Sequence, residues 1–185
     1  VDFAQTVAVN GFTQTDGTTS TTINGVLTNG GAFDFTGNAL SLLGSGNNTS
    51  TTFETTNSGT FTTGDGAALV VNALITENGT GHSVIGDDVT STTGAINFNS
   101  NVTLTSTDAI TIQTGEGDTD DLTITGNLAE TNNPGLTIDA GAAGDINIDG
   151  TVDLGTGSLT ITDAAVVDFA QTVAVNGFTQ TDGTT

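Results

Sequence analysis

The sequence predicts an all-β protein, a parallel β-solenoid (β-helix) with three short strands per coil and about seven coils per 166-residue repeat. One observation is that residues 1–19 recur without a change as residues 167–185. A second is that pairs of apolar residues, separated by one residue, recur along the chain between stretches of Gly, Asn, Asp and Thr. Short strands and turn residues that repeat with a period of roughly 20 to 30 residues are typical of solenoids.

The long repeat determines the expected domain organisation. The two copies of the 19-residue segment are offset by 166 residues. We therefore expect residues 1–166 to form one full solenoid repeat and residues 167–185 to begin the next identical one, in a single continuous solenoid. Such an offset also predicts a longer tandem array.

The apolar pairs predict the individual coils. Before residue 44 the expected strands contain Val1/Phe3, then Ile23, Leu27 and Phe33/Phe35, then Leu40/Leu42. Between residues 44 and 94 the pattern is less regular, with Phe53, Phe61, Leu69/Val71, Ile75 and Val84/Ile85. From residue 96 it is regular, with Ile96/Phe98, Val102/Leu104, Ile110/Ile112, Leu122/Ile124, Leu128, Leu136/Ile138, Ile146/Ile148, Val152/Leu154, Leu159/Ile161, Val167/Phe169 and Val173/Val175.

Alternation along each strand decides which side chains face inward. The paired apolar residues point to the interior, and the residues between them point outward. The outward residues Asn97, Thr123, Asn147 and Asp168 are expected to form one column, stabilised by side-chain hydrogen bonds. In this interpretation Val1/Phe3 and Val167/Phe169 open equivalent coils, so that a repeat holds a whole number of turns and rises about 34 Å.

Charge limits the partners. The chain has 21 acidic residues, no Lys or Arg, and a formal net charge of −21. Nucleic acid and anionic membrane surfaces are excluded as partners because both require basic side chains. No apolar run approaches the roughly 20 residues that span a bilayer, so no membrane insertion is expected in this segment. Divalent cations are the natural partners of so acidic a surface.

One acidic cluster suggests a calcium site. Residues 115–121, GEGDTDD, bring Glu116, Asp118, Asp120 and Asp121 into one turn between two strands. Hard carboxylate oxygens on a flexible turn suit Ca²⁺, and the segment partly resembles the calcium-binding nonapeptide G-G-x-G-x-D-x-U-x. Asp87 and Asp88 form a weaker candidate of the same kind. The alternative for both segments is a solvated acidic turn.

No catalytic site or cofactor other than Ca²⁺ is predicted. The residues offer no nucleophile, base and orienting group in a recognisable pattern, so we expect no enzyme. Paired carboxylates leave a glycoside hydrolase as the remaining enzymatic alternative. Thr-x-Thr pairs begin at Thr103, Thr123 and Thr160 and suggest an ice-binding face, but the coil assignment places them on three different strands.

The chain resembles filamentous-haemagglutinin-like and related giant tandem-repeat bacterial surface proteins. The resemblance is carried by GAINFNSNVTLTSTDAITIQTG, DLTITGN, GDINIDGTVDLGTGSLTI and AVVDFAQTVAVNGFTQTDGTT. It implies a right-handed parallel β-helix, secretion across the cell envelope, and a role as an adhesin stalk, matrix fibre or surface filament. The absence of Lys and Arg departs from such families and favours a passive shaft over an adhesive tip.

These observations together predict a structural repeat of an extracellular or cell-surface fibre. Its expected partners are neighbouring copies of the same repeat, in the same chain or end to end, and other filaments or glycans. Two alternatives stay open. One is a calcium-dependent adhesin, and the other is an ice- or glycan-binding solenoid.

Overall fold

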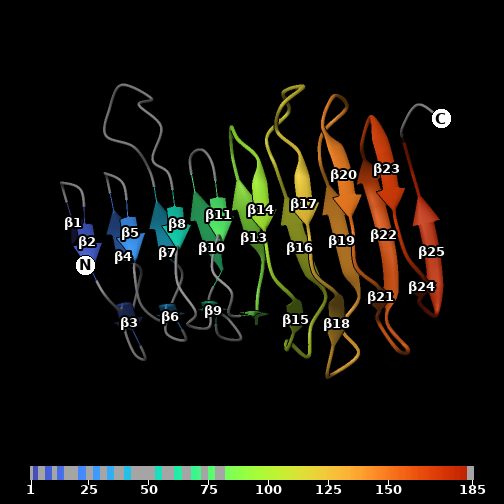
Figure 1. Cartoon of the computed structure of the whole chain (residues 1–185), viewed down its shortest axis with the longest axis horizontal. Helices are drawn as coiled ribbons and strands as arrows, with labels where there is room; N and C mark the ends of the chain where they lie inside the picture. Colours follow the sequence, from blue (N-terminus) through green and yellow to red (C-terminus); the bar gives the residue numbers. More distant parts are fainter. Residues whose placement is uncertain are drawn as a thin grey trace.

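The fold was obtained as a computed structural model. It describes residues 82–182 without interruption and, before them, Ala68 and the eleven strands β1 to β11. Figure 1 shows the strands stacked side by side along the longest axis, from the N-terminal end to the C-terminal end. Within the described residues, no helix is long and apolar enough to cross a membrane.

The described strands form three parallel sheets, which we name A, B and C. Sheet A contains β1 (Asp2–Phe3), β4 (Thr21–Ile23), β7 (Leu40–Leu42), β10 (Leu69–Val71), β13 (Val89–Ser91), β16 (Ile110–Gln113), β19 (Leu136–Asp139), β22 (Ser158–Asp163) and β25 (Gly177–Gln180). Sheet B contains β2 (Val7–Val9), β5 (Leu27–Asn29), β8 (Phe53–Thr55), β11 (Ile75–Glu77), β14 (Ile96–Phe98), β17 (Leu122–Ile124), β20 (Asp145–Ile148) and β23 (Val166–Phe169). Sheet C contains β3 (Phe12–Gln14), β6 (Phe33–Phe35), β9 (Phe61–Thr63), β12 (Ser83–Ile85), β15 (Val102–Leu104), β18 (Leu128–Glu130), β21 (Val152–Asp153) and β24 (Val173–Ala174).

Successive strands enter the three sheets in rotation, which is the topology of a solenoid. Each strand pairs in parallel with the strand three places earlier and the strand three places later. The uninterrupted residues 82–182 therefore hold β12, four complete turns from β13 to β24, and β25. The predicted all-β parallel solenoid with three strands per coil is confirmed.

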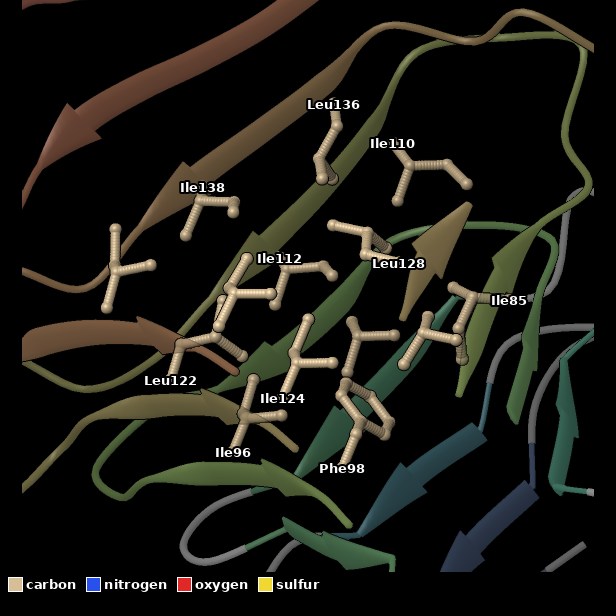
Figure 2. Close-up of a cluster of buried hydrophobic side chains, with 14 of the residues drawn as sticks. Ile85, Ile96, Phe98, Ile110, Ile112, Leu122, Ile124, Leu128, Leu136 and Ile138 are labelled. Carbon is tan, nitrogen blue, oxygen red and sulfur yellow. The ribbon is translucent and has the colours of Figure 1, made fainter. Parts of the chain in front are cut away.

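The core is the shared interior of the three sheets. In Ile96–Phe98 of sheet B and Val102–Leu104 of sheet C, the first and third residues are buried and the middle residue is half-buried. Figure 2 shows side chains from all three sheets, among them Ile112, Ile124 and Leu128, pointing into this interior. Fully burying an aliphatic or aromatic side chain stabilises a fold by about 1.5–3 kcal/mol. Because the columns run from turn to turn, no single coil has to build a core of its own.

Polar side chains interrupt the core ahead of Ile96. Thr63, Glu77, Ser83 and Ser91 are all buried. Three of them are hydrogen-bonded: Ser100 Oγ donates to Glu77 Oε2 (2.7 Å), Gly86 N to Thr63 Oγ1 (3.0 Å) and Gly94 N to Ser91 Oγ (3.0 Å). These inward polar residues explain why the apolar pattern is irregular in this part of the sequence. In β12 the inward residues are Ser83 and Ile85, so the expectation that Val84 faces the core is wrong.

Strand β13 is missed by the apolar pattern between residues 44 and 94. It has a single apolar residue, Val89, and its other inward residue is Ser91. With β13 included, β23 is the twenty-second strand after β1, which is seven turns of three strands plus one strand. The estimate of about seven coils per repeat is close, but the prediction of a whole number of turns is wrong. Asp2–Phe3 belongs to sheet A and Val166–Phe169 to sheet B, while Val1 lies outside the described residues.

Candidate functional site

The acidic segment 115–121 forms the corner between β16 of sheet A and β17 of sheet B. Glu116 and Asp118 are exposed, whereas Asp120 and Asp121 are half-buried. Asp120 Oδ2 accepts a hydrogen bond from Gly117 N (2.9 Å), and Asp120 N donates to Gly117 O (3.0 Å). The corner is therefore closed on itself by the Asp120 carboxylate.

The glycine that opens this corner is required by close approach. A Cβ on Gly115 would overlap with the Asp120 carboxylate and lie 2.9 Å from Gly94 N on the preceding turn. The Gly115 N–H donates to Gly94 O (3.2 Å), so the backbones of the two turns meet here. Gly115, Gly117 and Asp120 accordingly have structural roles in the corner.

Asp121 connects two turns. Its Oδ1 accepts a hydrogen bond from Asp145 N (2.8 Å) on the next coil. In the weaker candidate segment, Asp88 Oδ1 likewise accepts from Thr111 N (2.7 Å) on the next coil, while Asp87 Oδ1 accepts from Asp88 N (2.7 Å). In this structure these carboxylates are bound to backbone amides.

The structure does not bring the predicted ligands together as a metal cage. Across residues 82–182 and the described strands before them, no group of three or more His, Cys, Asp or Glu side chains is arranged to hold a metal ion. A specific calcium site at Glu116, Asp118, Asp120 and Asp121, or at Asp87 and Asp88, stays a prediction.

Sequence reasoning missed the side chains that connect the turns. We call five Asp and Asn oxygens the corner acceptors, because each lies at a corner and accepts a backbone N–H from a residue 23–26 positions later. The bonds run from Thr111 N to Asp88 (2.7 Å), Asn127 N to Asn101 (2.9 Å), Asp145 N to Asp121 (2.8 Å), Thr151 N to Asn127 (2.9 Å) and Thr156 N to Asn133 (3.2 Å). The sequence signal is an Asn or Asp in the connection before a strand, and only Asn101 and Asn127 occupy equivalent positions of successive turns.

The backbones of successive turns also approach closely at the corner between sheets B and C. A Cβ on Gly126 would overlap with the backbone of Ser100 and Asn101, and a Cβ on Gly150 would overlap with Gly126. The backbone of successive turns is thus in direct contact at this corner. The Asn127 side chain, one residue further on, makes its bond to the next turn beside that contact.

One carboxyl is perturbed by its surroundings. Glu130 ends β18, and its Oε2 is buried without a hydrogen-bond partner. Burial raises the pKa of the Glu130 carboxyl above its usual value, and the charge of Asp153 on the next turn adds to the rise. A hydrogen bond from the Asn133 backbone acts in the opposite direction on this pKa. Glu130 and Asp153 therefore form a pair of like charges on two successive turns.

Along the described strands, the three Thr-x-Thr pairs do not share one sheet. The predicted column Asn97, Thr123, Asn147 and Asp168 exists, in register along sheet B. The three Thr-x-Thr pairs begin in β15, β17 and β22, which belong to sheets C, B and A, as expected. Sheet A does align the four threonines Thr111, Thr137, Thr160 and Thr179. Beside that single column lie Gln113, Asp139 and Asp163, so the neighbouring column is polar and acidic.

The C-terminal end of the solenoid exposes apolar surface. Val166 and Phe178 are 52% and 50% exposed, whereas Leu159, the residue opposite Phe178 one turn earlier, is fully buried. Phe169, Val173 and Val175 are half-buried and pack against the core. Strands β23, β24 and β25 each pair on one side only. This end is an edge of all three sheets at once.

No protein-family model matches the chain, and no curated protein or solved structure matches it with significance. The strand pairing and the core described above are therefore the basis for assigning the fold. The likeness to filamentous-haemagglutinin-like proteins stays a prediction from the sequence pattern.

Proposed function

We propose that this chain is a passive structural segment, a stalk or shaft, of an extracellular fibre built from 166-residue repeats. The observation that carries the proposal is the unchanged recurrence of residues 1–19 as residues 167–185, combined with a fold in which turns add along one axis. A solenoid lengthens by stacking similar turns, so copies of the same sequence can follow one another along its axis.

The internal structure suits a load-bearing rod. Each turn is bonded to the next through three backbone ladders, and the corner acceptors add side-chain bonds between the ladders. The aliphatic core is continuous from Ile96 to Ile161. Extension of the rod would require these bonds and this core to separate together, which favours a mechanical role.

The surface suits a filament that stays dispersed. With 21 acidic residues and no basic ones, neighbouring fibres repel one another at neutral pH. Cations screen this repulsion and so set how closely fibres approach. The proposed partners are neighbouring repeats along the axis, and divalent cations around it.

The length of a tandem protein tests the proposal. Three proteins are purified and imaged by electron microscopy. They contain two, four or six tandem copies of residues 1–166, and each protein ends with residues 167–185. Straight rods that lengthen by about 35 Å for each added repeat are expected, since parallel strands lie about 4.8 Å apart. Compact particles joined like beads, with no proportional growth in length, would overturn the proposal.

A further inference from the structure

The two copies of the repeated segment occupy different sheets. In the first copy β1, β2 and β3 lie in sheets A, B and C, and in the second copy β23, β24 and β25 lie in sheets B, C and A. Thus Asp2–Phe3 and the identical Asp168–Phe169 belong to different faces of the solenoid. All three strands are displaced by one sheet, and in the same direction.

The displacement follows from pairing alone. Parallel ladders connect β1 to β25 without a break through sheet A, and β2 to β23 through sheet B. The sheet that holds each copy is therefore fixed by strand-to-strand hydrogen bonds, whatever the length of the loops between strands. A repeat of seven turns and one strand cannot return to its starting face.

The first copy shows what covers such a segment. On β1, β2 and β3 lie β4, β5 and β6, with Asp2 opposite Thr22, Val7 opposite Leu27 and Phe12 opposite Phe33. The end formed by β23, β24 and β25 has the same sequence, but its outer edge is uncovered. Because the two copies have the same sequence, we expect the same strands to pair with the second copy, displaced by one sheet.

We infer that the open end formed by β23, β24 and β25 binds a segment with the sequence of residues 21–35 from a following repeat, and that each repeat is thereby turned by one sheet, about a third of a turn, relative to the repeat before it. The following repeat belongs to the same chain or to a second copy of it. The inference rests on the proposed fibre and adds to it a defined joint and a defined rotation.

This rotation distributes every surface feature around the fibre. An acidic corner such as residues 115–121 faces three directions in three successive repeats and returns to its first direction in the fourth. Three repeats contain 22 complete turns, a rise of about 106 Å at about 4.8 Å per turn. The fibre then has no single acidic side, and its charge faces all directions equally.

A single cysteine per repeat makes the rotation visible. The chain has no Cys, and Asp149 is exposed. In the six-repeat protein, Asp149→Cys in every repeat is coupled to a small maleimide gold cluster and imaged by electron microscopy. The expected pattern is three rows of labels a third of a turn apart, each row repeating every 106 Å or so. A single row of labels along one side, repeating at about 35 Å, would refute the rotation.

Deleting one whole turn from each repeat tests whether the single extra strand sets the rotation. Removing residues 121–144 from each repeat takes out one turn, β17 to β19, and leaves six turns and one strand. Three rows of labels are again expected, with the repeats closer together by about 4.8 Å.

If this variant fails to fold, fibre diffraction from the unlabelled parent decides: off-meridional layer lines near 106 Å support the rotation, and layer lines only at orders of about 35 Å exclude it. Straight rods with one row of labels would refute the rotation and leave the proposed fibre intact, whereas beads would refute both.

Discussion

Phe169 and Phe178 meet edge to face at the C-terminal end of the solenoid, with ring centroids 6.3 Å apart and planes at 82°. They come from β23 of sheet B and β25 of sheet A, so the contact joins two sheets. Such a geometry is favourable for aromatic pairs. Phe178 remains half exposed, so the pair leaves apolar surface for the next turn.

Replacing Phe178 should weaken association between chains more than it weakens folding. Phe178→Asp places a charge at the apolar end, and we expect a lower fraction of end-to-end oligomers in sedimentation velocity, with a small change in thermal midpoint. Thr179→Asp is the matched control because it adds the same charge at a neighbouring exposed position. Equal loss of oligomers in both variants would mean that charge, and not the aromatic surface, controls association.

The Asn127 side chain should contribute measurably to the stacking of turns. Asn127→Ala removes the acceptor for Thr151 N, and we expect a loss of about 1 kcal/mol in the free energy of unfolding. Asn127→Asp keeps an acceptor oxygen and should recover most of that loss. Urea denaturation followed by circular dichroism measures both. No difference between the Ala and Asp variants would show that the hydrogen bond contributes nothing.

Gly126 and Gly135 should respond oppositely to the same substitution. Gly126→Ala forces a methyl group into the backbone of Ser100 and Asn101, so a loss of more than about 2 kcal/mol is expected. At Gly135 the nearest atoms to an added Cβ are 3.8 Å away, so Gly135→Ala should be neutral or stabilising. Denaturation midpoints compare the two. A tolerated Gly126→Ala would contradict the close contact between turns at this corner.

The raised pKa of Glu130 predicts that its charged form destabilises the fold. Between the usual carboxyl pKa and the raised one, the folded chain binds more protons than the unfolded chain, so this contribution to stability falls as the pH rises through that interval. Glu130→Gln should therefore raise the thermal midpoint at neutral pH and increase the free energy of unfolding by less than about 1 kcal/mol. Below the usual carboxyl pKa, the substitution should leave the thermal midpoint unchanged. Glu116→Gln, at an exposed position, controls for the loss of one charge. A larger gain from the control would argue against a specific effect at Glu130.

Calcium should act mainly through ionic strength. The carboxylates of Asp120 and Asp121 are bound to backbone amides, which favours diffuse cations over a closed site. Thermal midpoints in CaCl₂, MgCl₂ and NaCl are compared at equal ionic strength, and the two divalent salts should give similar values. Saturable calcium binding by calorimetry, lost in Asp118→Asn, would instead support the calcium-dependent adhesin.

The sequence was sufficient to predict the fold class, because apolar alternation from Ile96 onward matches the inward residues of most strands there. It was insufficient for the strand count, since β13 has Ser91 in an inward position and shows no apolar pair. A serine whose hydroxyl is bonded to Gly94 N is as acceptable inside as a small apolar residue, and composition does not reveal that bond. The corner acceptors were missed for a related reason: Asn and Asp at turns have many local uses, and only the three-dimensional stacking shows which amide they bind.

All five corner acceptors point the same way along the axis. In each bond the side-chain oxygen belongs to the earlier turn and the amide to the later one. The two ends of the rod are therefore chemically unlike, and two identical ends brought face to face cannot form these bonds. A filament made from this chain has polarity: it has a leading and a trailing end, and a subunit or anchor that fits one of them has no equivalent place at the other.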